Sequence, residues 1–254
     1  MRIALGIEYD GSSYFGWQSQ PNGLTVQDVL QQALSRIACE PLIVIAAGRT
    51  DTGVHAIEQV VHFDTQTLRP ITAWVRGVNS LLPASVSVLW AHAVDDTFHA
   101  RFSAQARSYS YYLYCRPVRS ALQYGKTGWF HQDLDVTKMR EGAQYLLGEH
   151  DFSAFRASEC QAKSPVKTLA KLDIQQQGSM ISIDLTANAF LHHMVRNIVG
   201  CLVYVGKGRH PPEWIASVLQ SRERSQAAPT FAPDGLYLRH IRYDPVWKLP
   251  QNVP

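Results

Sequence analysis

The order of strand-like and helix-like segments constrains this chain most, because a β-α-β-β-α-β pattern occurs twice along it. The first pattern has strands near 2–10, 41–47, 57–64 and 86–90, and helices that begin after Thr25 and after Pro70. The second has strands near 106–116, 166–176, 180–186 and 236–243, and helices at 136–147 and 189–205. Two split β-α-β halves of this ferredoxin-like kind predict an α/β (α+β) fold. We expect a continuous, mainly antiparallel sheet with helices packed on one face.

The predicted halves are residues 1–105 and 106–254. No Pro-, Gly- or Ser-rich linker separates them, so we expect them to pack as one body with a cleft between them. A short helix around 212–219 and a Pro-containing stretch at 227–233 are insertions on this plan.

The composition is that of a globular protein whose 254 residues suffice for a sizeable core. The first residues run directly into a strand pattern rather than a signal peptide, and no uncharged apolar segment is long enough to span a bilayer. We therefore expect a soluble, cytoplasmic protein. Its four scattered cysteines contain no Cys-x-x-Cys pair, so neither a disulfide framework nor a structural zinc site is predicted.

Charge is distributed unevenly between the halves. Residues 1–105 hold six Lys and Arg against nine Asp and Glu, whereas residues 106–254 hold 18 against 12, so the formal charges are −3 and +6. Basic clusters of the second half are Arg107, Arg116, Arg119 and Lys126; Lys163, Lys167 and Lys171; Lys207 and Arg209; and Arg222 and Arg224. Aromatic residues lie among the first cluster. Such a surface attracts phosphates and offers rings to unpaired bases, although an ordinary solvated face stays an equal alternative for any single cluster.

One predicted loop, Gly48–Gly53, holds a single carboxylate between a cation and a glycine turn. It joins residues 41–47, predicted as a buried strand, to the strand that begins at Ile57. Its two end glycines give backbone freedom and place Asp51 at the tip. Asp and Thr also cap ordinary turns, so that role stays open for Asp51, as does a surface role for Arg49. We interpret His55 as a local hydrogen-bonding residue.

The segment Ala189–Leu202 is apolar on nearly all sides of a helix, yet it contains Arg196. A buried guanidinium needs an anion, because an unpaired buried ion costs on the order of several kcal/mol. Asp51 is a candidate partner for Arg196. A purely structural ion pair and a side chain that reaches out to solvent are the alternatives.

Cofactor motifs are missing from the sequence. His192 and His193 are adjacent, so on a helix they point in different directions, and no further ligand stands at helical spacing. Gly206-Lys207-Gly208 lacks the spacing and the Ser or Thr of a phosphate-binding P-loop, and no Gly-x-Gly-x-x-Gly turn occurs. We expect no metal and no nucleotide cofactor.

A tyrosine-rich strand, Arg107–Cys115, places Tyr109, Tyr111 and Leu113 on one face. Tyrosines on strands usually pack in a core. A ring near a buried Asp and Arg would also stack on a planar substrate and offer its hydroxyl as a polar group.

Taken together, these segments resemble the tRNA pseudouridine synthases of the TruA type over nearly the whole chain. The resemblance rests on Tyr9–Gln20, on Arg49–Ala56, which resembles the family's catalytic loop, on Phe98–Ala104 with Arg107-Ser108-Tyr109, on His150-Asp151-Phe152, on Phe190–Gly200 and on Gly235-Leu236. No departure from the family pattern occurs at these positions.

The resemblance implies isomerisation of uridine to pseudouridine at positions 38, 39 and 40 of the tRNA anticodon stem-loop, by a homodimer without cofactors. It implies that Asp51 is the catalytic aspartate, Tyr109 the ring against the target uracil, and Arg196 the partner of the Asp51 carboxylate. Arg49 would enter the RNA where the target base has been extruded, and Leu236 would be an apolar wall of the pocket.

Two other classes stay open at this point. One is an RNA-binding module in which Asp51 and Arg196 form only an internal ion pair. The other is a nucleoside or glycoside hydrolase, which is disfavoured because such enzymes usually employ two carboxylates and only one is nominated here.

Overall fold

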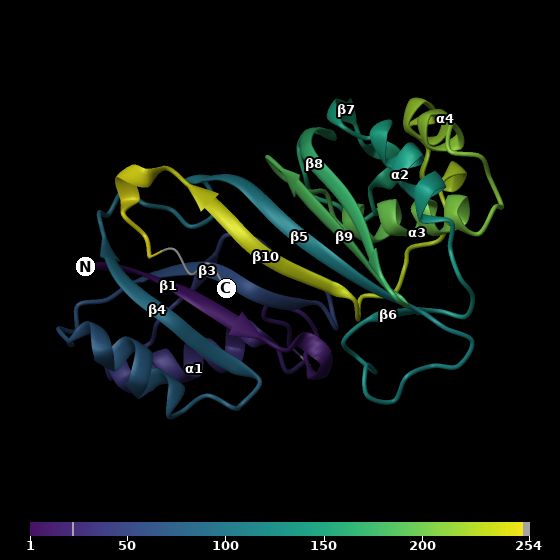
Figure 1. The fold of residues 1–254 in the computed structure, drawn as a ribbon. Helices are drawn as coiled ribbons and strands as arrows, with labels where there is room; N and C mark the ends of the chain where they lie inside the picture. Colours follow the sequence, from purple (N-terminus) through teal and green to yellow (C-terminus); the bar gives the residue numbers. More distant parts are fainter. Residues whose placement is uncertain (22, 251–254) are drawn as a thin grey trace. The chain divides into compact units, whose positions relative to one another are not determined.

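The computed structural model describes residues 1–21 and 23–250. The chain divides into two compact units: unit 1 comprises Met1–Gln105 with Leu238–Pro254, and unit 2 comprises Ala106–Tyr237. The chain passes from one unit to the other within strand β5 (Ala104–Cys115) and again within strand β10 (Leu236–Tyr243) (Figure 1).

Unit 1 is built on antiparallel strands, with β1 (Arg2–Tyr9) between β4 (Val86–Val94) and β3 (His55–Asp64). A two-residue strand, β2 (Ile45–Ala46), also pairs with β3. Helix α1 (Val26–Ala38) begins where Thr25 caps it, because the Thr25 side chain accepts a hydrogen bond from the amide of Asp28. Its apolar stripe, which includes Leu30 and Leu34, is fully buried. A π-helical turn, Ala73–Gly77, follows β3.

Unit 2 has the strand order β5-β9-β8-β7, in which every pair is antiparallel, and short β6 (Gly128–Phe130) runs parallel to β5. The other strands are β7 (Gly148–Asp151), β8 (Val166–Gln177) and β9 (Met180–Ala187). Helix α2 (Val136–Gln144) packs on β8 and on α3 (Met194–Gly206), and α4 (Trp214–Ser221) packs on both helices (Figure 1).

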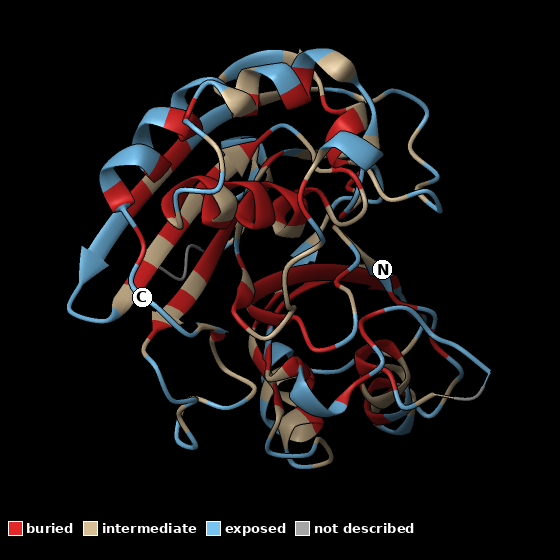
Figure 2. Cartoon of the chain, turned by 90° about the vertical axis from the view of Figure 1, so that its right-hand side faces the viewer, coloured by how far each residue is buried: buried red, intermediate tan, exposed pale blue. Residues whose placement is uncertain are grey.

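Short 3-10 turns complete the elements at Gly11–Ser13, Ser153–Phe155, Arg224–Gln226 and Pro245–Trp247. Buried and less buried residues alternate along β9, as expected where only one face packs on a core, whereas β1, β3 and α3 are buried along most of their length (Figure 2). No helix in the described part of the chain is long and apolar enough to cross a membrane.

The structure confirms a mixed α/β fold with mostly antiparallel strands, and two local predictions were wrong. Residues 41–47 form only the two-residue β2, and Ile43 is 77% exposed, because this segment lies at the edge of β3 rather than in the interior. The helix predicted from Ala189 begins at Met194, since His193 has a φ of +61° and starts the helix. Strands β6 and β7 are absent from the predicted elements, because they are too short to show a sequence period.

Candidate active site

The loop that contains Asp51 connects β2 to β3 in unit 1 and is fixed to neighbouring segments by its backbone. The Gly48 carbonyl accepts a hydrogen bond from Gln59 Nε2 at 2.8 Å. The Thr50 carbonyl accepts one from the Trp17 amide at 3.0 Å. Asp51 is half-buried and Arg49 is exposed. The loop therefore presents a carboxylate and a guanidinium on a fixed backbone.

Two residues of the N-terminal segment hold the centre of this loop. Tyr9 Oη and Thr50 Oγ1 are 2.8 Å apart in a buried hydrogen bond. Gly16 has a φ of +81°, and a Cβ there would lie 2.6 Å from the Thr50 carbonyl oxygen and 3.0 Å from the Asp51 carbonyl carbon. Only glycine allows this approach, so Gly16 sets the path of the backbone at Asp51.

The two glycines of the loop differ in what they contribute. Gly53 has a φ of +79°, and the Val54 amide donates to the Asp51 carbonyl at 3.1 Å, so residues 51–54 form a tight turn that requires glycine at its third position. Gly48 has no positive φ, and no atom lies within 4 Å of a Cβ placed on it. The predicted glycine turn is thus confirmed at Gly53, whereas Gly48 does not adopt a conformation that requires glycine.

His55 is the first residue of β3 and is buried. Its Nδ1 accepts a hydrogen bond from the Gly11 amide at 3.1 Å and lies 3.2 Å from Asp10 Oδ1. Gly11 also packs directly on Val54. This confirms the interpretation of His55 as a local hydrogen-bonding residue, which here ties the end of the Asp51 loop to the N-terminal segment.

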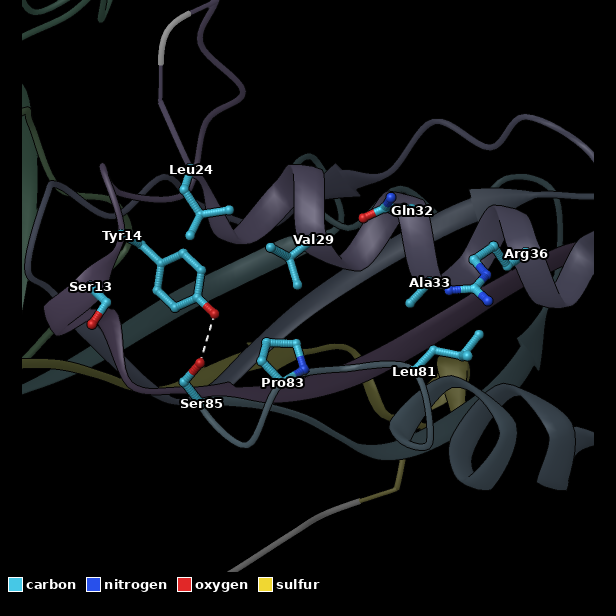
Figure 3. A pocket seen from close by; sticks show the side chains of 10 residues that line it. All are labelled: Ser13, Tyr14, Leu24, Val29, Gln32, Ala33, Arg36, Leu81, Pro83 and Ser85. Atoms are coloured by element: carbon cyan, nitrogen blue, oxygen red, sulfur yellow. Dashed lines mark hydrogen bonds between the residues drawn. The ribbon is translucent and has the colours of Figure 1, made fainter.

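A cavity of about 390 Å³ lies near this loop in unit 1, between α1 and the segment that precedes β4 (Figure 3). Within it, Tyr14 Oη and Ser85 Oγ are 2.7 Å apart. The predicted site residues are not among the described residues that line it.

Tyr109 and Arg196 both belong to unit 2. Tyr109, on β5, is 8% exposed, and its ring meets that of Phe190 edge-on with centroids 5.0 Å apart. Arg196 is half-buried and lies in the first turn of α3. The sequence predicts a longer helix with Arg196 at its centre. Its Nε donates to the Phe231 carbonyl at 2.8 Å, and the Phe231 amide donates to the Arg196 carbonyl at 3.2 Å.

The first turn of a helix favours anions, so a cation at this position is electrostatically unfavourable for the helix itself. Helix stability therefore does not explain the presence of Arg196. Its Nε has a neutral carbonyl partner that the sequence does not reveal. The remaining donors of a planar guanidinium suit a carboxylate.

The segment Phe231–Leu236 contacts Arg196 of α3, and three further contacts hold it against β5. Tyr111 Oη donates to the Ala232 carbonyl at 2.9 Å, the Tyr112 amide donates to the Gly235 carbonyl at 2.8 Å, and the rings of Tyr111 and Phe231 meet edge-on. Burial raises the pKa of Tyr111, so it stays a neutral donor. Leu236, the last residue of this segment and the first of β10, is buried.

The structure thus brings Asp51 and Arg49 together on one loop of unit 1, and it places Tyr109, Arg196 and Leu236 in unit 2. Sequence reasoning missed Gly16, Gln59 and the Phe231 carbonyl as supports of these residues. Gly16 had a detectable signal, because it is a second glycine in the predicted N-terminal loop. The Phe231 carbonyl had none, since backbone partners leave no trace in side-chain identity.

Comparison with known proteins identifies close relatives. The profile of a family described as tRNA pseudouridine synthase matches residues 6–103 and 143–244. Proteins named tRNA pseudouridine synthase A from Chromobacterium violaceum, Methylobacillus flagellatus and Nitrosomonas eutropha are 62%, 60% and 58% identical to this chain. The alignments cover 99%, 98% and 98% of this chain and 97%, 96% and 90% of those proteins.

Proposed function

This chain belongs to the tRNA pseudouridine synthase family, whose members convert uridine to pseudouridine in tRNA, and we propose that Asp51 carries out the bond chemistry of this reaction. The observation that carries the proposal is the fixed Asp51 loop, which lies within the residues that the family profile matches. Residues 1–105 then supply the carboxylate, and residues 106–254 supply the pocket walls and the basic RNA surface.

The reaction breaks the bond between the ribose and a uracil nitrogen, and it forms a bond between the ribose and uracil C5. It involves no redox change and no external group, so one placed nucleophile or base suffices. A carboxylate can attack a sugar carbon, add to a ring carbon or remove a sugar proton. Arg196 would favour the charged form of that carboxylate and fix its orientation. Its half-buried guanidinium in the anion-favouring first turn of α3 supports this assignment.

The glycosidic bond is inaccessible in a stacked helix, so the target base must be flipped out at a cost of roughly a few kcal/mol. Tyr109, with its ring oriented by Phe190, would stack on the flipped uracil, and Leu236 would close the pocket with an apolar side chain. Arg49, which is exposed two residues before Asp51, would occupy the gap that the flipped base leaves in the RNA stack. Binding energy at these positions would offset the cost of flipping.

Within tRNA, we assign the target to positions 38, 39 and 40 of the anticodon stem-loop, acted on by a cytoplasmic homodimer. These finer assignments rest on the family resemblance of the motifs, including Arg49–Ala56 and Gly235-Leu236. No cofactor enters the proposed chemistry.

The test uses tRNA transcripts labelled with tritium at uracil C5, because forming the carbon–carbon bond at C5 releases that tritium to water. We expect the unaltered protein to release it and to leave pseudouridine only at positions 38, 39 and 40. Binding without release would indicate an RNA-binding module. Free uracil would indicate a hydrolase. Release from other positions would contradict the anticodon assignment alone.

A further inference from the structure

The loop between β5 and β6, residues 116–127, extends away from the strands in unit 2 (Figure 1) and lies between the two ranges that the family profile matches. Its base is anchored. The Arg116 amide donates to the Phe130 carbonyl at 3.0 Å, Trp129 Nε1 donates to the Arg116 carbonyl at 2.9 Å, and Tyr237 Oη donates to the Lys126 carbonyl at 2.8 Å. The loop therefore projects from fixed ends.

Its charge has one sign. The loop contains Arg116, Arg119 and Lys126, and no Asp or Glu occurs from residue 116 to residue 132. Arg119 is exposed, and its guanidinium carbon lies 4.8 Å from the centroid of the Tyr124 ring. Three cations in a projecting loop whose own sequence contains no acidic residue favour a polyanion as the partner.

Its apolar groups are unusually exposed. Tyr124 is 71% exposed and Leu122 is 92% exposed. Neither side chain is buried in the core of unit 2, so folding alone does not explain their presence in the loop. An exposed ring backed by a guanidinium is the arrangement on which proteins stack unpaired bases.

The loop is continuous with the proposed pocket. Its end is held by Tyr237, which is next to Leu236 in β10, and its start follows β5, which carries Tyr109. Gly128 packs directly on Tyr111, and Tyr111 in turn holds the segment that leads to Leu236. A nucleic acid bound at the pocket residues of unit 2 therefore has this loop beside it.

We propose that loop 116–127 is a second tRNA contact, in which Arg119 and Lys126 bind backbone phosphates and Tyr124 stacks on an unpaired nucleotide other than the target uridine. This inference rests on the proposed function. A second copy of this chain is a poorer occupant, because a two-fold contact of loop on loop would bring six like charges together. The contact serves tRNA affinity and not the bond chemistry.

The test measures tRNA binding, KM and kcat for Tyr124→Ala and Arg119→Glu. Lys138→Glu is the matched control, since Lys138 is an exposed cation of the same unit outside the loop. We expect Tyr124→Ala to weaken tRNA binding by about tenfold, the order of one lost base stack. Arg119→Glu should lower the slope of log affinity against log salt by about 0.7 to 0.9. Both should raise KM, leave kcat at saturating tRNA unchanged, and melt like the unaltered protein.

Loop variants that bind tRNA as tightly as Lys138→Glu and the unaltered protein would overturn the proposal, and so would a loss confined to kcat. Unchanged tRNA affinity with an altered sedimentation coefficient would assign the loop to a protein interface instead. Absence of tritium release by the unaltered protein would refute the proposed function, whereas normal release with unaffected loop variants would refute this inference alone.

Discussion

The Tyr9 hydroxyl lies 2.8 Å from the Thr50 hydroxyl, in a buried hydrogen bond that joins the end of β1 to the residue before Asp51. Thr50 is also held by its carbonyl, which accepts from the Trp17 amide. The backbone that carries the carboxylate is thus fixed by a strand on one side and by the N-terminal loop on the other. Positioning of this kind accounts for much of the efficiency of an enzyme group.

Removing the Tyr9 hydroxyl tests this relationship. We expect Tyr9→Phe to lower kcat by about tenfold with little change in KM, because Asp51 loses orientation while the tRNA contacts remain. The free energy of unfolding should fall by about 1 kcal/mol, the usual value of one buried hydrogen bond. Tyr14→Phe is the control, since it removes a hydroxyl pair with Ser85 in the same unit and keeps the backbone bond from the Gly53 amide to the Tyr14 carbonyl. Equal kcat losses in both variants would contradict the positioning role.

Gly16 gives a steric test of the same loop. Gly16→Ala should reduce kcat by more than about tenfold, because a methyl group would collide with the Thr50 carbonyl and displace the backbone at Asp51. Gly178→Ala is a matched control: Gly178 also has a positive φ, of 57°, but no atom lies within 4 Å of its added Cβ. We expect Gly178→Ala to lose roughly 1 kcal/mol of stability and to keep its activity. Measuring kcat and thermal unfolding of both variants separates collision from backbone strain.

Arg196 is predicted to serve catalysis more than binding. Arg196→Ala should lower kcat by about a hundredfold or more while tRNA affinity changes little, because the carboxylate loses its charged partner. Arg224→Ala is a fitting comparison, since this half-buried arginine binds Asn197 and Thr230 in the same unit. It should cost stability and leave kcat nearly unchanged. A stable, fully active Arg196→Ala enzyme would refute the ion pair with Asp51.

His62 predicts a pH dependence of stability in unit 1. It is buried on β3, where its Nδ1 accepts from the Ala100 amide at 3.1 Å, and burial lowers its pKa to about 4. The unfolded chain binds a proton near pH 6.5, so between pH 6.5 and pH 4 the unfolded state takes up more protons. Stability should therefore fall as the pH falls through this window, by up to about 3 kcal/mol.

The variant His62→Asn keeps an acceptor for the Ala100 amide and removes the titration. Chemical denaturation at pH 7 and at pH 4.5 should show a smaller loss of stability for His62→Asn than for the unaltered protein. The same loss in both proteins would show that other groups account for it.

Sequence reasoning succeeds in this chain where the physical signal is local and periodic. Helix α1 follows from a capping Thr25 and an apolar stripe, and β10 begins and ends where its alternation does. The start of α3 was predicted five residues too early, because apolar residues from Ala189 continue the pattern while His193 adopts a left-handed conformation. Composition does not encode that change of backbone.

The candidate site likewise contains residues that the sequence identifies and residues that only the folded structure reveals. Asp51 and Gly53 are recognisable from a motif, since a turn of this shape requires glycine at one position. The supports of the loop are long-range: Tyr9 and Gln59 reach it from strands, and Gly16 reaches it through a loop that the sequence leaves unplaced. Only tertiary packing shows that these residues meet.

The role of Asp51 is tested most directly by single-turnover tritium release from C5-labelled tRNA, with tRNA binding measured on the same preparations. We expect Asp51→Asn, which keeps the size of the side chain and removes its charge, to bind tRNA within about threefold of the unaltered protein and to release no tritium. Release by Asp51→Asn at the rate of the unaltered protein would contradict the assignment of the bond chemistry to this carboxylate.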